Sequence, residues 1–328
     1  MESSKMIPIY KPFLEGNYKK YVNDALDSTW ISSKGAFLDL FEQVFSDRVL
    51  RGAHSTAVCN GSVALDLALR VIGVGPGDEV ICPNFTYVAT ANAILRANAT
   101  PVFVDIDHLD WNLCVNEVCK NVNEKTKAII PVHIYGAPCK MSELQEVASR
   151  YGLWIVEDCA EAIGSQYLGQ HVGTFGDIST FSFFGNKTVT TGEGGMVCCR
   201  DEKLIEAARH LKSQAVSADK EYWHDDVGFN FRMTNIQAAI GLSQLELLDK
   251  ILKQKSDIFQ AYQKNIKSEY IQFQGHVEGS VHSRWMVALR FPNSALAGEI
   301  RKTLLSKGVE TRPAFPLLTE MPMYKGFK

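Results

Sequence analysis

From about residue 55 the chain alternates short apolar runs with amphipathic segments, and this alternation most limits what it can fold into. The runs are apolar throughout, not only at every second position; they are STAVCN (55–60), EVICP (79–83), TPVFVDID (100–107), KAIIPVHI (127–134) and LWIVED (153–158). Strands of that kind are covered on both faces, as in parallel sheets flanked by helices. The sequence therefore predicts a large α/β domain with a mostly parallel, doubly wound sheet.

Two capping boxes mark expected helix starts. Ser142 with Gln145 is predicted to open the helix ending at Gly152, and Thr234 with Gln237 to open a long helix further on. A domain boundary is placed within or after that second helix, near Leu247, giving an N-terminal arm and large domain over 1–246 and a small α+β domain over 247–328. The small domain is expected to hold a polar helix, a strand over RWMVALRF (284–291) and a helix around 297–306.

Composition excludes several classes of protein. The 328 residues carry a net charge of −3, with no clustered basic excess of the kind that nucleic acid requires. The one dense basic run, Lys250 to Lys255, is interpreted as the solvated face of a helix. No apolar segment is long enough for a membrane and no targeting segment is visible, so a cytoplasmic location is predicted. The eight cysteines form no CxxC pair; most are interpreted as small buried side chains, and all as reduced thiols.

Polar residues follow three of the predicted strands, where parallel sheets bind ligands. Gly61 and Ser62 follow the first strand and precede a helix, a place suited to phosphate. Asp158 ends the strand LWIVED, and Lys187 follows the strand-like TFSFF in surroundings without other charges. Each feature alone has an ordinary explanation, because helix caps are common at such places and most lysines are solvated.

Taken in chain order, these features match the needs of pyridoxal 5′-phosphate. Its phosphate needs amides and hydroxyls, its ring needs an aromatic face such as Tyr87, and its pyridine nitrogen needs a carboxylate. Its aldehyde needs a lysine amine, which Lys187 would supply as a Schiff base. Ser182 is either a phosphate donor or a buried structural hydroxyl.

The sequence also resembles a known family over nearly its whole length, from about Ile7 onward. STWISSKG, NGSVALDLAL, GPGDEVICPNFTYVATANAI, EDCAEAIGS, GDISTFSFFGNKTVTTGEGGMV and GFNFRMTNIQAAIGLSQLE resemble the sugar-nucleotide aminotransferases of the DegT/DnrJ type, and among them the perosamine synthase-like members. The resemblance implies the fold type I of pyridoxal phosphate-dependent transferases and a homodimer with a shared active site. Family chains continue some tens of residues further, so the small domain is expected to be incomplete at its carboxyl end.

The resemblance also implies roles for individual residues. Lys187 corresponds to the Schiff-base lysine and Asp158 to the carboxylate on the pyridine nitrogen, while Glu161 corresponds to a Gln or Glu near the ring hydroxyl. The remaining implied cofactor contacts are Tyr87 with the ring and Gly61, Ser62 and Ser182 with the phosphate. Asn230 corresponds to an asparagine that the neighbouring subunit contributes to the phosphate site. Candidates for substrate contact are Ser32, Arg232 and Arg312, with surface or interface pairing as the alternative for the arginines.

The implied reaction is transfer of an amino group from L-glutamate to the C4 ketone of a nucleotide-linked 4-keto-6-deoxyhexose, as in deoxyamino sugar and glycan biosynthesis. GDP-4-keto-6-deoxymannose is favoured as the acceptor. The alternatives left open are a dTDP-4-keto-6-deoxyglucose 4-aminotransferase, a 3-aminotransferase of a ketosugar nucleotide, and an impaired cofactor-binding or sensor protein.

Other enzyme classes lack their motifs. The glycines at 73, 75 and 77 follow a helix and not a strand, which is the wrong context for a dinucleotide-binding GxGxxG. No GxxxxGK[ST] loop occurs, and the eight histidines show no HxxxH or HxH spacing, so no metal site is expected.

Overall fold

The structure, a computed structural model, describes residues 6–327 and confirms the predicted mostly parallel α/β sheet. Seven strands lie in the order β1-β9-β8-β5-β4-β2-β3. β9 is antiparallel to both of its neighbours, and the other pairs are parallel. In chain order the strands are β1 (His54–Val58), β2 (Glu79–Pro83), β3 (Thr100–Val104), β4 (Thr126–Ile129), β5 (Trp154–Asp158), β8 (Ile178–Ser182) and β9 (Gly195–Cys199).

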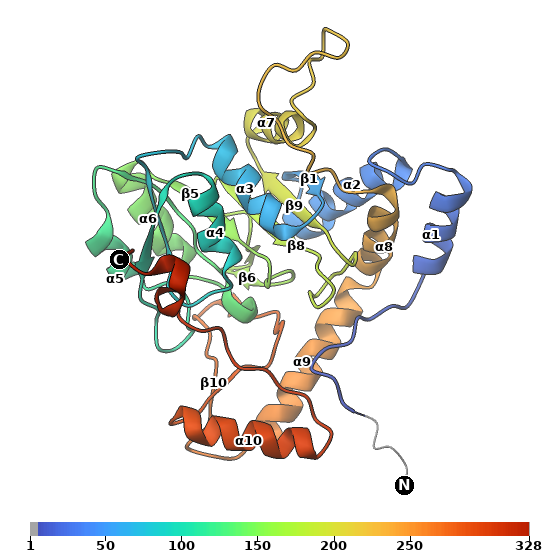
Figure 1. Cartoon of the computed structure of the whole chain (residues 1–328). Coiled ribbons are helices and arrows are strands. Elements are labelled where there is room, and N and C mark those ends of the chain that lie inside the picture. The colour runs from blue at the N-terminus through green and yellow to red at the C-terminus, as the bar shows by residue number, and fades with distance from the viewer. Residues whose placement is uncertain (1–5, 328) are drawn as a thin grey trace.

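Helices cover both faces of this sheet (Figure 1). One face packs against α3 (Gly61–Val71), α4 (Ala89–Arg96) and α7 (Glu202–Lys212). The other face packs against α2 (Ala36–Leu50), α5 (Val115–Asn121), α6 (Met141–Tyr151) and α8 (Asn235–Glu246). Burial on both sides explains why the strands are apolar throughout.

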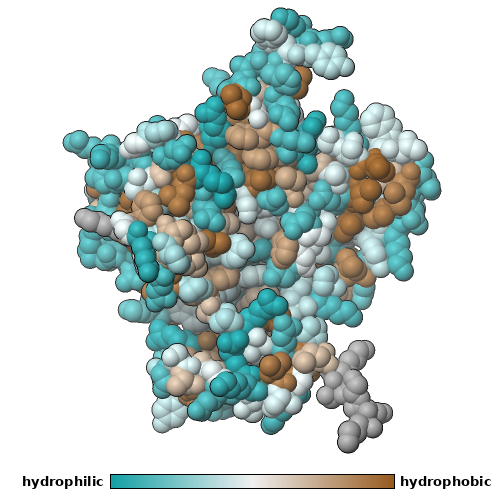
Figure 2. Space-filling view, in the orientation of Figure 1, coloured by the Kyte–Doolittle hydropathy of each residue, from teal (hydrophilic) through white to brown (hydrophobic). Residues whose placement is uncertain are grey.

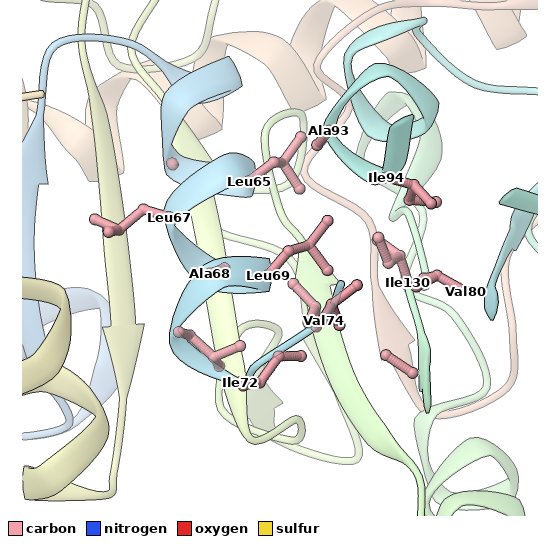
Figure 3. Packing of buried hydrophobic residues seen from close by; sticks show 14 of the residues in the cluster. Leu65, Leu67, Ala68, Leu69, Ile72, Val74, Val80, Ala93, Ile94 and Ile130 are labelled. Carbon is pink, nitrogen blue, oxygen red and sulfur yellow. The ribbon is translucent and has the colours of Figure 1, made fainter. Parts of the chain in front are cut away.

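Consecutive residues of one strand belong to different clusters of the hydrophobic core. Val80 and Cys82 of β2 join the cluster under α3 and α4, whereas Ile81 between them joins the cluster under α5 and α6. Figure 3 shows Leu69 of α3 and Ile94 of α4 lying near Val80 and near Ile130, which follows β4. The core thus holds the strand ends, where the candidate site lies, at fixed positions.

One of the two predicted capping boxes is present. Thr234 and Gln237 bond reciprocally at the start of α8, as expected. The box predicted for Ser142 and Gln145 is wrong, because α6 begins at Met141 and has no side-chain cap. Gln145 instead donates to the carbonyl of Phe175 at 2.8 Å, a tertiary contact that competes with capping.

α8 ends at Glu246, and α9 (Leu248–Asn265) begins after Leu247. Beyond α9 follow α10 (Ser294–Ser306), a pairing of β10 (Gln272–Phe273) with β12 (Leu289–Arg290), and β11 (Ser280–Val281), which pairs with β6 (Gln166–Tyr167) and through it with β7 (Gln170–His171). The domain boundary itself remains a prediction.

Two expectations about this carboxyl-terminal part are wrong in part. Of the stretch 284–291 only Leu289–Arg290 is a strand, and Trp285 instead donates from Nε1 to the carbonyl of Asn186 in the loop after β8.

The basic run from Lys250 to Lys255 is only partly solvated. Lys250 and Lys253 are exposed, as expected, but Lys255 is partly buried and donates to the carbonyl of Trp285 at 3.1 Å.

The segment before α1 (Tyr18–Asp27) is an extended arm (Figure 1), which contacts the residues after α10 and the loop between β8 and β9. Ile7 forms a parallel bridge with Val309, and the Tyr10 hydroxyl donates to the carbonyl of Lys187 at 2.6 Å. Within the described residues no helix is long and apolar enough to cross a membrane.

Candidate functional site

Lys187 lies in the loop between β8 and β9, with 12% of its side chain exposed. Its Nζ atom is 3.7 Å from Glu161 Oε1 and 4.2 Å from the centre of the Trp285 ring. The isolated lysine of the sequence therefore has a carboxyl group and an aromatic face beside it. A largely desolvated amine in such a place is suited to bonding with a carbonyl compound.

Asp158 ends β5 next to β8 and is 5% exposed. Its Oδ2 accepts a hydrogen bond from the Thr90 hydroxyl at 2.8 Å, and its Oδ1 accepts one from the amide of Ala160 at 3.1 Å. The helix-cap interpretation is thus partly right, since Asp158 turns the chain after β5. The same contacts fix the direction of a buried carboxylate at the mouth of the sheet.

Glu161 is 4% exposed and accepts a hydrogen bond from the amide of Tyr135 at 2.7 Å. Burial raises the pKa of Glu161 to about 7, against the lowering influence of Lys187 and the Tyr135 amide. Near neutral pH this carboxyl group therefore exists in both protonation states, beside the amine of Lys187.

The start of α3 touches the end of β8. A Cβ atom on Gly61 would lie 2.6 Å from Ser182 Cβ and 2.9 Å from Ser182 Oγ, so only glycine fits there. Asn60 caps the helix by accepting from the amide of Val63, and Ser62 occupies the first turn. Helix-start amides thus lie beside the hydroxyl of Ser182, an arrangement suited to phosphate.

Tyr87 precedes α4 and is 56% exposed, with its ring centre 5.8 Å from that of Phe315. Phe315 stacks on Tyr135 at 5.4 Å, and Tyr135 stacks on Trp285 at 6.1 Å. This row of rings joins the candidate stacking residue Tyr87 to the aromatic face beneath Lys187.

The residues present fit pyridoxal phosphate by the groups they offer. A largely buried amine, a buried carboxylate at a strand end and helix-start amides beside a hydroxyl are what its aldehyde, ring nitrogen and phosphate require. Because a Cβ at Gly61 would meet Ser182, the backbone at the start of α3 stays close to that hydroxyl.

The candidates for substrate contact lie elsewhere in the single chain. Arg232 lines an open groove of about 1120 Å³ together with Ser33, next to the exposed Ser32, and neither Lys187 nor Asp158 lines it. Asn230 accepts from Arg232 Nε at 3.1 Å and is exposed. Arg312 is exposed and pairs with Glu310, as the alternative interpretation for this arginine expected.

Sequence reasoning missed the role of Glu157, which is fully buried beside Asp158. It accepts hydrogen bonds from the amides of Gly173, Phe175 and Gly176, and faces His133 Nε2 at 3.1 Å. Although burial acts to raise it, these hydrogen bonds hold the pKa of Glu157 below its ordinary value.

Glu157, His133 and Cys159 could hold a metal by proximity, with ligand atoms within 4.8 Å of one another. The second ring nitrogen of His133 already accepts from the Cys139 amide at 3.0 Å, and the carboxylate of Glu157 already has its amide donors. The group therefore ties β5 to the loop before β8.

Two other contacts of Lys187 were also missed, namely those with Tyr10 and Trp285. Each comes from a segment far from Lys187 in sequence, so no local spacing indicates them.

Residues 13–328 match the DegT/DnrJ/EryC1/StrS aminotransferase family. The GDP-perosamine synthase of Escherichia coli O157:H7 is 49% identical over 98% of this chain and 87% of its own length. That of Vibrio cholerae is 45% identical over 98% of this chain and 88% of its own length. The PLP form of the putative sugar aminotransferase Spr1654 from Streptococcus pneumoniae superposes with a TM-score of 0.92 and 29% identity, covering 98% of this chain and 88% of that one.

Proposed function

The chain belongs to the DegT/DnrJ/EryC1/StrS aminotransferase family, and from that premise we propose that it transfers an amino group from L-glutamate to the C4 ketone of GDP-4-keto-6-deoxymannose. The product would be a GDP-linked 4-amino-4,6-dideoxy sugar. Two relatives at 45% and 49% identity, each matched over 98% of this chain, carry the name GDP-perosamine synthase, which favours the GDP sugar over the dTDP alternative.

The proposal rests on one observation: Lys187, Glu161 and Asp158 lie together at the ends of β5 and β8. Lys187 Nζ lies 3.7 Å from Glu161, and both carboxylic residues are buried. A nucleophilic amine beside a group that titrates near neutrality is what repeated proton movement at pH 7 requires.

The residues named above would hold pyridoxal phosphate, whose ring, once bound, supplies the electron sink for the reaction. Lys187 would bond to its aldehyde, Asp158 would face its ring nitrogen and Tyr87 would cover its ring. Its phosphate would be received by Gly61, Ser62 and Ser182. Because Thr90 and the Ala160 amide hold both oxygens of Asp158, the carboxylate needs no reorientation on binding.

Once the amine of the donor has replaced it on the aldehyde, Lys187 Nζ would be the free base that takes the proton from the α-carbon of glutamate. Glu161 stands beside it as a group that holds or gives up a proton at Oε1. The stacked rings of Trp285, Tyr135 and Phe315 border this region on the side of the small domain and keep water away from the amine. Arg312 and Arg232 are proposed to bind acidic groups of the substrates.

A homodimer is part of the proposal, with Asn230 reaching the partner's phosphate site. Exposed apolar side chains gather over α1 and α2 in Figure 2, where Leu26, Ile31 and Leu40 are exposed. Residues 213–230 project beyond α7 in Figure 1 and present Tyr222 and Trp223 to solvent. Surfaces of this kind are typical of subunit interfaces.

The test is the visible absorption spectrum of the purified protein incubated with pyridoxal phosphate, recorded before and after addition of L-glutamate. We expect a visible band that glutamate bleaches, and renewed colour when GDP-4-keto-6-deoxymannose is added. Lys187→Ala serves as the control, because it keeps the pocket but removes the amine. Bleaching without amino transfer to any GDP ketosugar would contradict the substrate, and turnover by Lys187→Ala would contradict the site.

A further inference from the structure

One side chain of the small domain touches both the backbone and the amine of the reactive lysine loop. Trp285 Nε1 donates to the carbonyl of Asn186 at 2.7 Å, and the face of the same indole lies 4.2 Å from Lys187 Nζ. Trp285 itself is only 6% exposed. The indole can therefore fix the path of the loop and the place of its amine together.

The indole is held rigidly by its own surroundings. The ring of Trp285 stacks on Tyr135 with an interplanar angle of 18°, and the backbone amide of Trp285 donates to the carbonyl of Tyr135 at 3.0 Å. Lys255 Nζ donates to the carbonyl of Trp285 at 3.1 Å, from α9. Tyr135 adopts a left-handed backbone with φ of 53°, which a side chain accepts only where the surroundings demand it.

A second contact holds the lysine loop from the arm. The Tyr10 hydroxyl donates to the carbonyl of Lys187 at 2.6 Å, so the carbonyls of Asn186 and Lys187 are both bound by distant side chains. The Lys187 amide donates to Phe184 within the loop. The loop thus owes much of its shape to residues outside its own strands.

Glu161 and Trp285 differ in how they attract the amine of Lys187. Because burial raises the pKa of Glu161 to about 7, its charge disappears as the pH falls through neutrality. An aromatic face attracts an ammonium by its quadrupole and does not titrate. The indole is therefore a place for the charged amine that persists when Glu161 is protonated.

We propose that Trp285 is a positioning residue for Lys187, holding the loop through Asn186 and receiving the free amine on its ring whenever the lysine is not bonded to cofactor. This rests on the proposed function in so far as Lys187 is the reactive lysine. Without the indole, the amine would leave the position from which it must act at the α-carbon of the donor.

The test compares Trp285→Phe, which keeps an aromatic face but loses the N–H donor, with Trp285→Leu, which loses both. Trp154→Phe, at the far end of β5, is the matched control. In cofactor-free protein, the rate of reductive methylation of Lys187 by formaldehyde is followed by peptide mass spectrometry, with the exposed Lys203 as internal reference. We expect Trp285→Leu to be labelled several-fold faster, Trp285→Phe to be intermediate, and Trp154→Phe to match the parent protein.

The second readout is the glutamate half-reaction of the loaded protein. We expect kcat to fall about tenfold in Trp285→Phe and further in Trp285→Leu, with KM for glutamate changed less than threefold, because the amine is misplaced and the donor site is intact. Parent-like labelling and kcat in Trp285→Phe would overturn the proposal, and this conservative variant decides the matter if Trp285→Leu does not fold. The labelling needs no sugar substrate, so failure of the sugar assignment leaves this result interpretable.

Discussion

At the scale of single residues, the site depends on carboxyl groups whose surroundings give them different properties. Asp158 has hydrogen-bond donors on both oxygens, whereas Glu161 has the Tyr135 amide on one oxygen and Lys187 near the other. Glu157 is enclosed by backbone amides. Three carboxylates within five positions of the sequence thus have different surroundings, which suit the roles proposed for them in cofactor orientation, proton exchange and structure.

Asp158→Asn is expected to lower the rate of the glutamate half-reaction by about a hundredfold, because an amide cannot hold a proton on the pyridine nitrogen. Stopped-flow absorbance on the loaded variant measures this rate. The matched control is Asp257→Asn, because Asp257 lies on α9, is exposed and forms an ion pair with Lys253. A variant of Asp158 within threefold of the parent protein would remove Asp158 from its proposed role.

Glu161→Gln is expected to stay active but to lose the part of the pH profile that falls near 7. The raised pKa also affects stability: the native protein binds the Glu161 proton more tightly than the unfolded chain, whose value is near 4.5. The unfolding free energy of the cofactor-free parent should therefore rise relative to Glu161→Gln as pH falls from about 7 towards 4.5. Urea unfolding at a series of pH values measures the difference, and a constant difference would contradict the assigned titration.

The sequence identified the residues whose chemistry is unusual for their place, such as Lys187 after an apolar strand and Asp158 at a strand end. It could not indicate Trp285 or Tyr10, because their contacts with the loop of Lys187 join segments far apart in the sequence. Nor could it distinguish Glu157 from Asp158, because their opposite directions follow from the alternation of a strand that is buried on both faces.

At the scale of elements, the contact of α3 with β8 shapes the proposed phosphate site. Gly61→Ala is expected to raise the dissociation constant for pyridoxal phosphate at least tenfold, because its Cβ would lie 2.6 Å from Ser182 Cβ and would push the helix start away. Titration of the visible band measures this constant. Gly75→Ala is the control, since nothing lies within 4 Å of a Cβ at that position. Equal affinity in both variants would contradict the close approach.

The strands of the sheet were predictable because continuous apolar runs require cover on two faces. The reversed direction of β9 was not predictable, since GMVCC is as apolar as the parallel strands of the sheet. The capping box at Thr234 was found, but the one at Ser142 fails, because Gln145 has a tertiary partner that local sequence does not reveal.

At the scale of the whole molecule, the proposed dimer joins surfaces that a single chain leaves exposed. Tyr222 is 97% and Trp223 51% exposed on the projecting segment 213–230. Replacing both by Ser is expected to raise the dimer dissociation constant at least tenfold, because buried aromatics dominate interfaces. Sedimentation velocity over a dilution series measures it, with Tyr270→Ser, an exposed tyrosine after α9, as the control. A fully active monomer at all concentrations would contradict the shared site.

The arm contacts set an order in which the protein can be completed during synthesis. Tyr10 and Lys187 are 177 positions apart, and Ile9 bonds to Glu310 across 301 positions. A chain emerging from the ribosome exposes Lys187 before Trp285 has been made, and Glu310, the partner of the arm, follows later still. The sheet can form early, but the loop of Lys187 lacks its contact with the indole until residue 285 is present. A chain interrupted before that residue would therefore carry the sheet without the side chain proposed to position Lys187.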